Sequence, residues 1–211
     1  MNVLAIGAHF DDVEIGCGGA MLKYKNRGHD THLVVVTDSE YTNHDGRLIR
    51  SGANALYEGT RSAKMMGVTS FITMGLPSKQ VKADYVLIEG LNSVMDKLKP
   101  DVIFTHWHGD IHEDHYEIAR ASLVAARHYP TVLMYRSNWY HTNLDFSGRL
   151  HLDITSVIED KAELMRLHET EYNRRGEAWV DFMKARAKEA GLRVGVPYAE
   201  EYEVHKYKVT I

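Results

Sequence analysis

The sequence predicts an α/β fold with a mostly parallel sheet and helices on both of its faces. Short apolar runs rich in β-branched residues alternate with longer segments whose apolar residues recur at helical spacing, a pattern typical of such sheets. No linker, repeat or low-complexity segment divides the 211 residues, and this length can bury a substantial core. We therefore expect a single Rossmann-like domain over residues 1–211.

In the N-terminal half, apolar runs predict four strands, and segments of helical periodicity lie between them. The strands are expected at residues 3–6, 31–37, 70–74 and 101–104. The helices are expected at about residues 19–26, 47–66 and 84–98. Gly67 ends the second helix and Pro100 begins the turn into the fourth strand. The polar stretch 38–45 reads as a loop.

The C-terminal half continues with helices and strands but loses the regular alternation. Helices are expected at about 115–127, 157–174 and 178–190, and strands at 132–135 and 150–154. The tail over 194–209 mixes tyrosines with charged residues. It is expected to form an edge strand or a lid.

Composition excludes several classes of function. The chain has 25 Lys and Arg and 29 Asp and Glu, so its net charge of −4 gives no general attraction to nucleic acid or to an anionic membrane. No apolar stretch approaches the roughly 18 residues of a membrane span, and the N-terminus lacks a basic signal-peptide region. Cys17 is the single cysteine, so no internal disulfide forms. We expect a cytoplasmic protein, and a homo-oligomer is compatible with the sequence.

Two polar clusters follow predicted strands. His9, Asp11 and Asp12 come directly after the first strand, and residues 105–115 bring four histidines and two aspartates after the fourth. The carboxyl ends of parallel strands meet at one edge of a sheet, where open α/β proteins keep their sites. A metal held by His9, Asp12 and one histidine of the second cluster would keep a coordination position for water.

These clusters have other interpretations. The first could be an Asp-rich turn with a helix-capping carboxylate. The glycines at 16, 18 and 19 suggest a nucleotide-binding module, but the dinucleotide motif should follow the first strand directly, and carboxylates repel pyrophosphate. A metal-binding protein without catalysis would not need Asp11 and His112.

The sequence at this point resembles a known family. Ala8-His9-Phe10-Asp11-Asp12 is similar to the Ala-His-Pro-Asp-Asp signature of the PIG-L/LmbE-like N-acetylglucosamine deacetylases, and residues 112–115 are similar to its His-x-Asp-His element. The resemblance continues through the segment 58–68, His168 and residues 198–200, so it spans nearly the whole chain.

This resemblance implies a role for each site residue. His9, Asp12 and His115 would bind the metal, Asp11 would be the general base, and His112 would be the polarising acid, oriented by Asp114. The metal is expected to be zinc, or alternatively ferrous iron or another first-row divalent ion, because two imidazoles and a carboxylate discriminate weakly. The implied partner is a small N-acetylated sugar or its conjugate, and the implied reaction is removal of its N-acetyl group. Hydrolysis of a different amide or ester at the same site is the alternative.

The chain departs from the family pattern at two positions. Phe10 stands in place of proline, and Ala55 stands where many members have an arginine. Arg47, Arg50 and Arg61 are candidates to replace that arginine.

Several further residues receive weaker assignments. Asp110 is interpreted as a helix cap rather than a residue that orients a ligand. His106 and His108 are interpreted as loop residues or as residues that contact a ligand, rather than as ligands themselves. Trp107, Trp139 and Tyr140 are interpreted as packing aromatics, although each could stack on a sugar ring. His168 is placed near the site by the resemblance alone. Glu200 is expected to be a structural acid.

Overall fold

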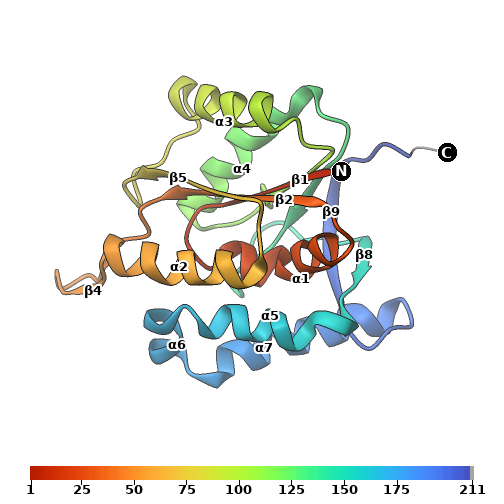
Figure 1. The fold of residues 1–211 in the computed structure, drawn as a ribbon. Helices are drawn as coiled ribbons and strands as arrows, with labels where there is room; N and C mark the ends of the chain where they lie inside the picture. Colours follow the sequence, from red (N-terminus) through yellow and green to blue (C-terminus); the bar gives the residue numbers. More distant parts are fainter. Residues whose placement is uncertain (210–211) are drawn as a thin grey trace.

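The computed structural model describes residues 1–209, and its centre is a seven-stranded sheet with the order β5-β2-β1-β6-β7-β9-β8 (Figure 1). The first five strands in this order are parallel, and β9 runs antiparallel to both of its neighbours, β7 and β8. Their bounds are β1 (Asn2–Gly7), β2 (Asp30–Thr37), β5 (Ser70–Leu76), β6 (Val102–His106), β7 (Val132–Tyr135), β8 (Leu150–Asp153) and β9 (Ala199–Lys206). The predicted α/β class with a mostly parallel sheet is confirmed.

Helices cover both faces of this sheet. On one face lie α3 (Tyr85–Leu98) and α4 (Glu113–Ala125), which is extended by the 3-10 turn η1 (Ala126–His128). On the other lie α1 (Asp12–Asn26) and α2 (Gly52–Met66). A further layer of helices packs on α1 and α2 (Figure 1): α5 (Ile158–Arg166), preceded by η2 (Thr155–Val157), α6 (Glu169–Arg175) and α7 (Glu177–Arg193).

The core has two parts because the sheet buries side chains on both faces. Successive side chains of β1 point to opposite faces of the sheet. Val3 and Ala5 face α1, whereas Leu4 and Ile6 face α3 and α4. All four side chains are fully buried. Within residues 1–209, no helix has the length and apolar character required to cross a bilayer.

Helix α1 begins seven residues earlier than expected, at Asp12 instead of Gly19. It is broken at Cys17, whose φ of −143° is not helical. The break leaves the amides of Gly19 and Ala20 without helical partners, and the Glu200 carboxylate accepts both at 2.8 Å. The broken helix therefore requires a residue of β9, which no local pattern in the first 30 residues reveals. This contact makes Glu200 the structural acid that was expected.

Two other segments also differ from the sequence-based expectations. Residues 47–50 do not start a helix, because β3 (Tyr41–Thr42) and β4 (Leu48–Arg50) form a small antiparallel hairpin and Ser51 then caps α2. Strand β9 is not an edge strand, since it lies between β7 and β8. Its residues Ala199 and Tyr202 are fully buried.

Candidate metal centre and active site

The site lies at the carboxyl ends of β1 and β6, which are neighbouring parallel strands. The loop after β1 carries His9 and Asp11 and leads into α1 at Asp12. The loop after β6 carries Asp110 and ends at His112, the residue before α4. The two sequence clusters, about a hundred residues apart, therefore share one pocket, which is lined by residues of both.

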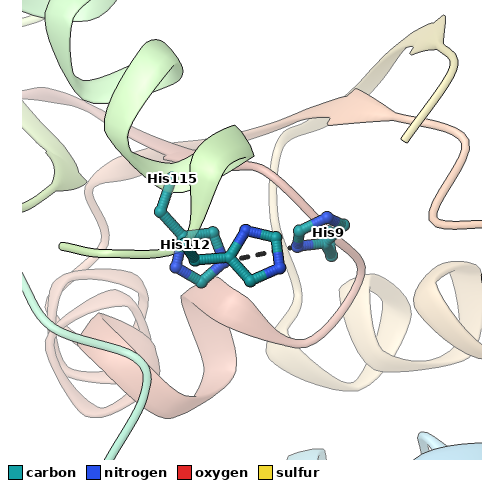
Figure 2. Close-up of side chains that lie close together, drawn as sticks. All are labelled: His9, His112 and His115. Carbon is teal, nitrogen blue, oxygen red and sulfur yellow. Dashed lines mark hydrogen bonds between the residues drawn. The ribbon is translucent and has the colours of Figure 1, made fainter. Parts of the chain in front are cut away.

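Three side chains place donor atoms at nearly equal spacing. His9 Nδ1 lies 3.3 Å from His115 Nε2 (Figure 2). Asp12 closes a triangle of side chains and faces each histidine with a different oxygen, Oδ2 at 3.3 Å from His9 Nδ1 and Oδ1 at 3.2 Å from His115 Nε2. In a tetrahedral site with metal–ligand distances of about 2.1 Å, two ligand atoms lie about 3.4 Å apart. The donor set and its spacing therefore fit a divalent metal.

The charges of these groups also favour a cation. Burial alone would lower the pKa of His9 and of His115, but contacts with Asp114 and Asp12 raise that of His9 to about 9. For His115, the neighbouring Asp12 and Asp110 raise it to about 10. Although burial opposes its ionisation, the pKa of Asp12 lies well below its usual range because His115 and His106 adjoin it. In the absence of a metal, protonated imidazoles supply the positive charge that these carboxylates require.

His9, His112 and His115 form a second grouping of possible ligands, and His106 offers a third with Asp12 and His115. Its Nε2 lies 3.3 Å from Asp12 Oδ2 but accepts a hydrogen bond from the backbone N–H of Ala8 at 2.9 Å. An amide only donates, so the lone pair of this nitrogen is already used. His106 ends strand β6 and is fully buried, so it is not a loop residue, and of the two expected placements the structure has the one beside a candidate ligand, Asp12.

Asp110 and Asp114 hold His115 and His9 in place. Asp110 Oδ2 lies 3.0 Å from His115 Nδ1, while its Oδ1 accepts the His112 amide at 2.9 Å. It is therefore more than a helix cap. Asp114 Oδ2 lies 3.0 Å from His9 Nε2 and not against His112, which it was expected to orient. Such carboxylate contacts fix the ring orientation of a metal-binding histidine.

Asp11 lies in the same pocket and makes no side-chain hydrogen bond within the described residues. Burial and the adjacent negative charge of Asp12 raise its pKa to about 6, although Arg50 opposes the shift. Its φ of 156° and ψ of −23° are uncommon for a residue other than glycine. A carboxylate with this pKa can take a proton near neutral pH.

His112 stacks on His115, with ring centroids 4.2 Å apart. Burial, His115 and His9 lower its pKa to about 4. Its Nδ1 is buried and has no hydrogen-bond partner among the described residues. His112 therefore presents a neutral imidazole to the pocket, not the protonated ring that was expected.

Of the three candidate arginines, Arg50 is the one that lines the pocket. It is only 3% exposed and donates to the backbone oxygen of Phe10 at 3.0 Å. Glu58, a residue of α2, forms an ion pair with Arg50 at 3.2 Å and fixes its position. Arg61 instead pairs with Glu169 at the surface. His168 is fully buried, 3.4 Å from Arg50 and 3.1 Å from Glu14, so it supports the pocket wall without lining it.

The outer wall of the pocket contains residues that sequence reasoning missed. Lys79, Ser137, Arg174 and Arg175 line it together with Trp139 and Tyr140, which are 40% and 41% exposed. Trp107 is buried and does not line it. Ser137 donates to Asp12 Oδ1 at 2.9 Å. Neither Lys79 nor the arginines lie in a motif, and only the folding of the loop after β5 and of α6 brings them here.

Comparison with known families supports the interpretation of this geometry. Residues 4–126 match the family model described as PIG-L, GlcNAc-PI de-N-acetylase. The chain belongs to the PIG-L family. An uncharacterized deacetylase of Escherichia coli K12, YaiS, is 30% identical over 149 residues, which are 65% of this chain and 76% of that protein. The resemblance inferred from the motifs is confirmed, and the chain is an enzyme of the deacetylase type.

Solved structures share the fold over nearly the whole chain. The N,N'-diacetylchitobiose deacetylase of Pyrococcus horikoshii has a TM-score of 0.82 at 21% identity and covers 96% of this chain and 83% of its own. GalB of Pseudomonas putida, a 4-carboxy-2-hydroxymuconate hydratase, has a TM-score of 0.80 at 19% identity and covers 100% and 98%. The same fold thus serves two reaction classes, so the reaction must be argued from the site.

Proposed function

We propose that this chain is a metal-dependent hydrolase that removes the N-acetyl group from an N-acetylamino sugar or its conjugate. The observation that carries this proposal is the triangle of His9, Asp12 and His115 beside the free carboxylate of Asp11. The family match supports the reaction, and the neighbour that acts on diacetylchitobiose supports a sugar substrate. The alternative, a protein that binds the metal but has no catalytic activity, would leave Asp11 and His112 without a role.

His9 Nδ1, Asp12 and His115 Nε2 would hold zinc, or alternatively ferrous iron or another first-row divalent ion. When bound, such an ion lowers the pKa of a coordinated water and polarises the acetyl carbonyl. His9 and His115 must be neutral to bind it, and their protons leave when it enters. Asp114 and Asp110 then keep the other nitrogen of each ring oriented.

Asp11 and His112 would carry the proton transfers. Asp11 takes the proton from the attacking water, for which a pKa near neutrality is suited. His112 donates an N–H toward the oxygen of the acetyl group as negative charge develops there. The proton held on Asp11 then reaches the leaving amine. Arg50, which lies beside Asp11, would contact the substrate in place of the arginine common in the family.

The decisive experiment replaces the proposed base. Metal-loaded wild type and Asp11→Asn are incubated with a panel of N-acetylamino sugars and conjugates, and acetate, free amine and bound metal are quantified. Asp11→Asn is expected to lower kcat at least about a hundredfold. It should keep one equivalent of metal, because Asp11 is not among the three ligands.

His108→Gln is the matched control, because His108 belongs to the second cluster but does not line the pocket. It should keep both activity and metal. Equal loss of activity in both variants, or an Asp11→Asn enzyme as active as wild type, would contradict the assignment of the base. Bound metal with no acetate from any substrate would favour another amide, an ester or a hydration reaction.

A further inference from the structure

Lys79 adopts a backbone conformation that a lysine does not prefer. Its φ is 64°, in the left-handed region where glycine is tolerated and side chains cost free energy. Within residues 1–209, four residues other than glycine have positive φ, and three of them, Asp11, Ser39 and Lys79, line the pocket. The fourth, Lys99, ends α3. Unfavourable conformations of this kind concentrate at functional sites.

The backbone contact of Lys79 does not explain why a lysine is present. Its amide donates to Asp114 Oδ2 at 2.8 Å, and the same oxygen lies 3.0 Å from His9 Nε2. The loop after β5 is thereby attached to the candidate metal centre. Glycine would make the same hydrogen bond without the conformational cost, so the use of lysine must lie in its side chain.

The side chain of Lys79 extends from this anchor toward the hairpin. Its ammonium lies 4.8 Å from the centre of the Tyr41 ring and donates to the backbone oxygen of Thr42 at 3.2 Å. The Arg174 guanidinium lies 5.6 Å from the same ring centre. Tyr41 therefore gathers two cations from separate parts of the chain at the outer wall of the pocket.

A third cation adjoins them, and only one buried carboxylate balances the two arginines. Glu171 accepts from Arg174 at 2.5 Å and from Arg175 Nε at 2.9 Å. Arg175 is held over the Trp139 ring at 4.6 Å. Lys79, Arg174 and Arg175 against Glu171 leave two positive charges. The exposed Glu40 also lines the pocket and leaves one, and the remaining acids of the lining, Asp11 and Asp12, belong to the candidate metal centre.

We propose that the outer wall formed by Lys79, Arg174 and Arg175 binds an anionic group, a carboxylate or a phosphate, on a part of the substrate remote from the acetamido group. This inference rests on the proposed deacetylation and specifies its substrate class as an anionic N-acetylated glycoconjugate. Aromatic rings and Glu171 hold these cations in place before the ligand arrives, so less conformational entropy is lost on binding. A neutral sugar would gain little from them.

The test compares three ligands that share one N-acetylglucosamine ring. The methyl β-glycoside is neutral, the carboxymethyl β-glycoside carries a carboxylate and the 1-phosphate carries a phosphate. Binding to metal-loaded Asp11→Asn is measured by calorimetry, and kcat/KM is measured with wild type. At low salt at least one anionic ligand should bind about three- to tenfold more tightly than the neutral one. The preference should shrink at high salt, because this wall is exposed to solvent.

Lys79→Gly should abolish most of this preference while remaining no less stable than wild type. Relief of the left-handed conformation offsets the larger unfolded-state entropy of glycine. Lys99→Gly is the matched control, because it makes the same change at the end of α3, outside the pocket. It should keep the full preference. Lys79→Arg should retain it too, because it keeps the charge.

The outcomes separate this inference from the proposed function. If wild type deacetylates all three ligands with equal kcat/KM, and Lys79→Gly has the same kcat/KM values, the anion site is overturned. The proposed deacetylase function would still stand. Absence of acetate release, together with anion binding that depends on Lys79, would support the anion site and overturn the proposed function. A preference for one anionic ligand over the other would identify the group.

Discussion

Both oxygens of the Asp12 carboxylate are held by contacts within the site. Its Oδ2 accepts the amide of His9 at 2.7 Å, and its Oδ1 accepts the hydroxyl of Ser137 at 2.9 Å. It also lies against three imidazoles, those of His9, His106 and His115. These contacts keep it ionised and fix both oxygens, so the triangle of donor atoms is preorganised for a cation.

Asp110 contacts the proposed ligand His115 but is not itself one of the three proposed ligands. Asp110→Ala should lower metal affinity about 10- to 100-fold, because the ring of His115 loses the carboxylate that orients it. Competition with a chromogenic chelator measures this affinity.

Asp84→Ala is the control for that experiment. Asp84 caps α3 by accepting the amide of Leu87 at 3.1 Å, away from the site. Its replacement should cost about 1 kcal/mol of unfolding free energy and leave metal affinity unchanged. Equal metal affinity in wild type and Asp110→Ala would remove the positioning role.

At the scale of elements, helix α1 places Asp12 in its first turn and then breaks at Cys17. The first turn lies unusually close to the sheet at Gly16, where an added Cβ would come within 2.0 Å of the Tyr135 ring. Tyr135 in turn donates to the backbone oxygen of Ile6 at 2.8 Å. The absence of a side chain at residue 16 thus sets the position of the helix that carries Asp12.

Two glycine substitutions in α1 should therefore behave differently. Gly16→Ala should cost roughly 1–3 kcal/mol or more, because a buried aromatic ring must move. Gly18→Ala meets only ordinary contacts at 3.5 Å and beyond and should be neutral or stabilising by up to about 1 kcal/mol, as alanine is the better helix former. Urea unfolding of both variants measures the difference. Similar stability of the two variants would contradict the close approach at Gly16.

At the scale of the whole molecule, strand β9 near the end of the chain is needed to complete the fold. The candidate metal ligands all lie before residue 116. Strand β9 pairs with β7 and β8, and its Glu200 contacts the buried Lys161 of α5 as well as the broken helix α1. The C-terminal segment is therefore part of the core and not a separate lid.

Truncation tests whether residues 1–211 act as a single domain. Removal of residues from Ala199 onward should abolish cooperative unfolding, because Lys161 would be left buried without its partner and β7 would become an edge. Removal from Tyr207 onward spares β9 and should keep one transition. Near- and far-UV circular dichroism during thermal unfolding measures both. A separate, stable transition in the shorter chain would indicate two domains.

The sequence alone determined the fold class, the family and the two clusters that form the site. Those features depend on local patterns: apolar periodicity sets strands and helices, and a motif of adjacent residues carries its own chemistry. His9, Asp12 and His115 follow from such motifs, and in the structure each pair of these side chains has polar atoms within 3.3 Å, with a different Asp12 oxygen facing each histidine. The cytoplasmic location and oligomeric state expected from the sequence stay predictions.

The tertiary structure alone decided which residues surround those motifs. Arg50 faces the pocket because a hairpin replaces the expected start of a helix, and Asp114 contacts His9 because two loops meet at the sheet edge. Lys79, Arg174 and Arg175 come together around aromatic rings from distant segments. Such contacts depend on the packing of elements far apart in the chain, and no periodicity or motif in a single segment records that packing.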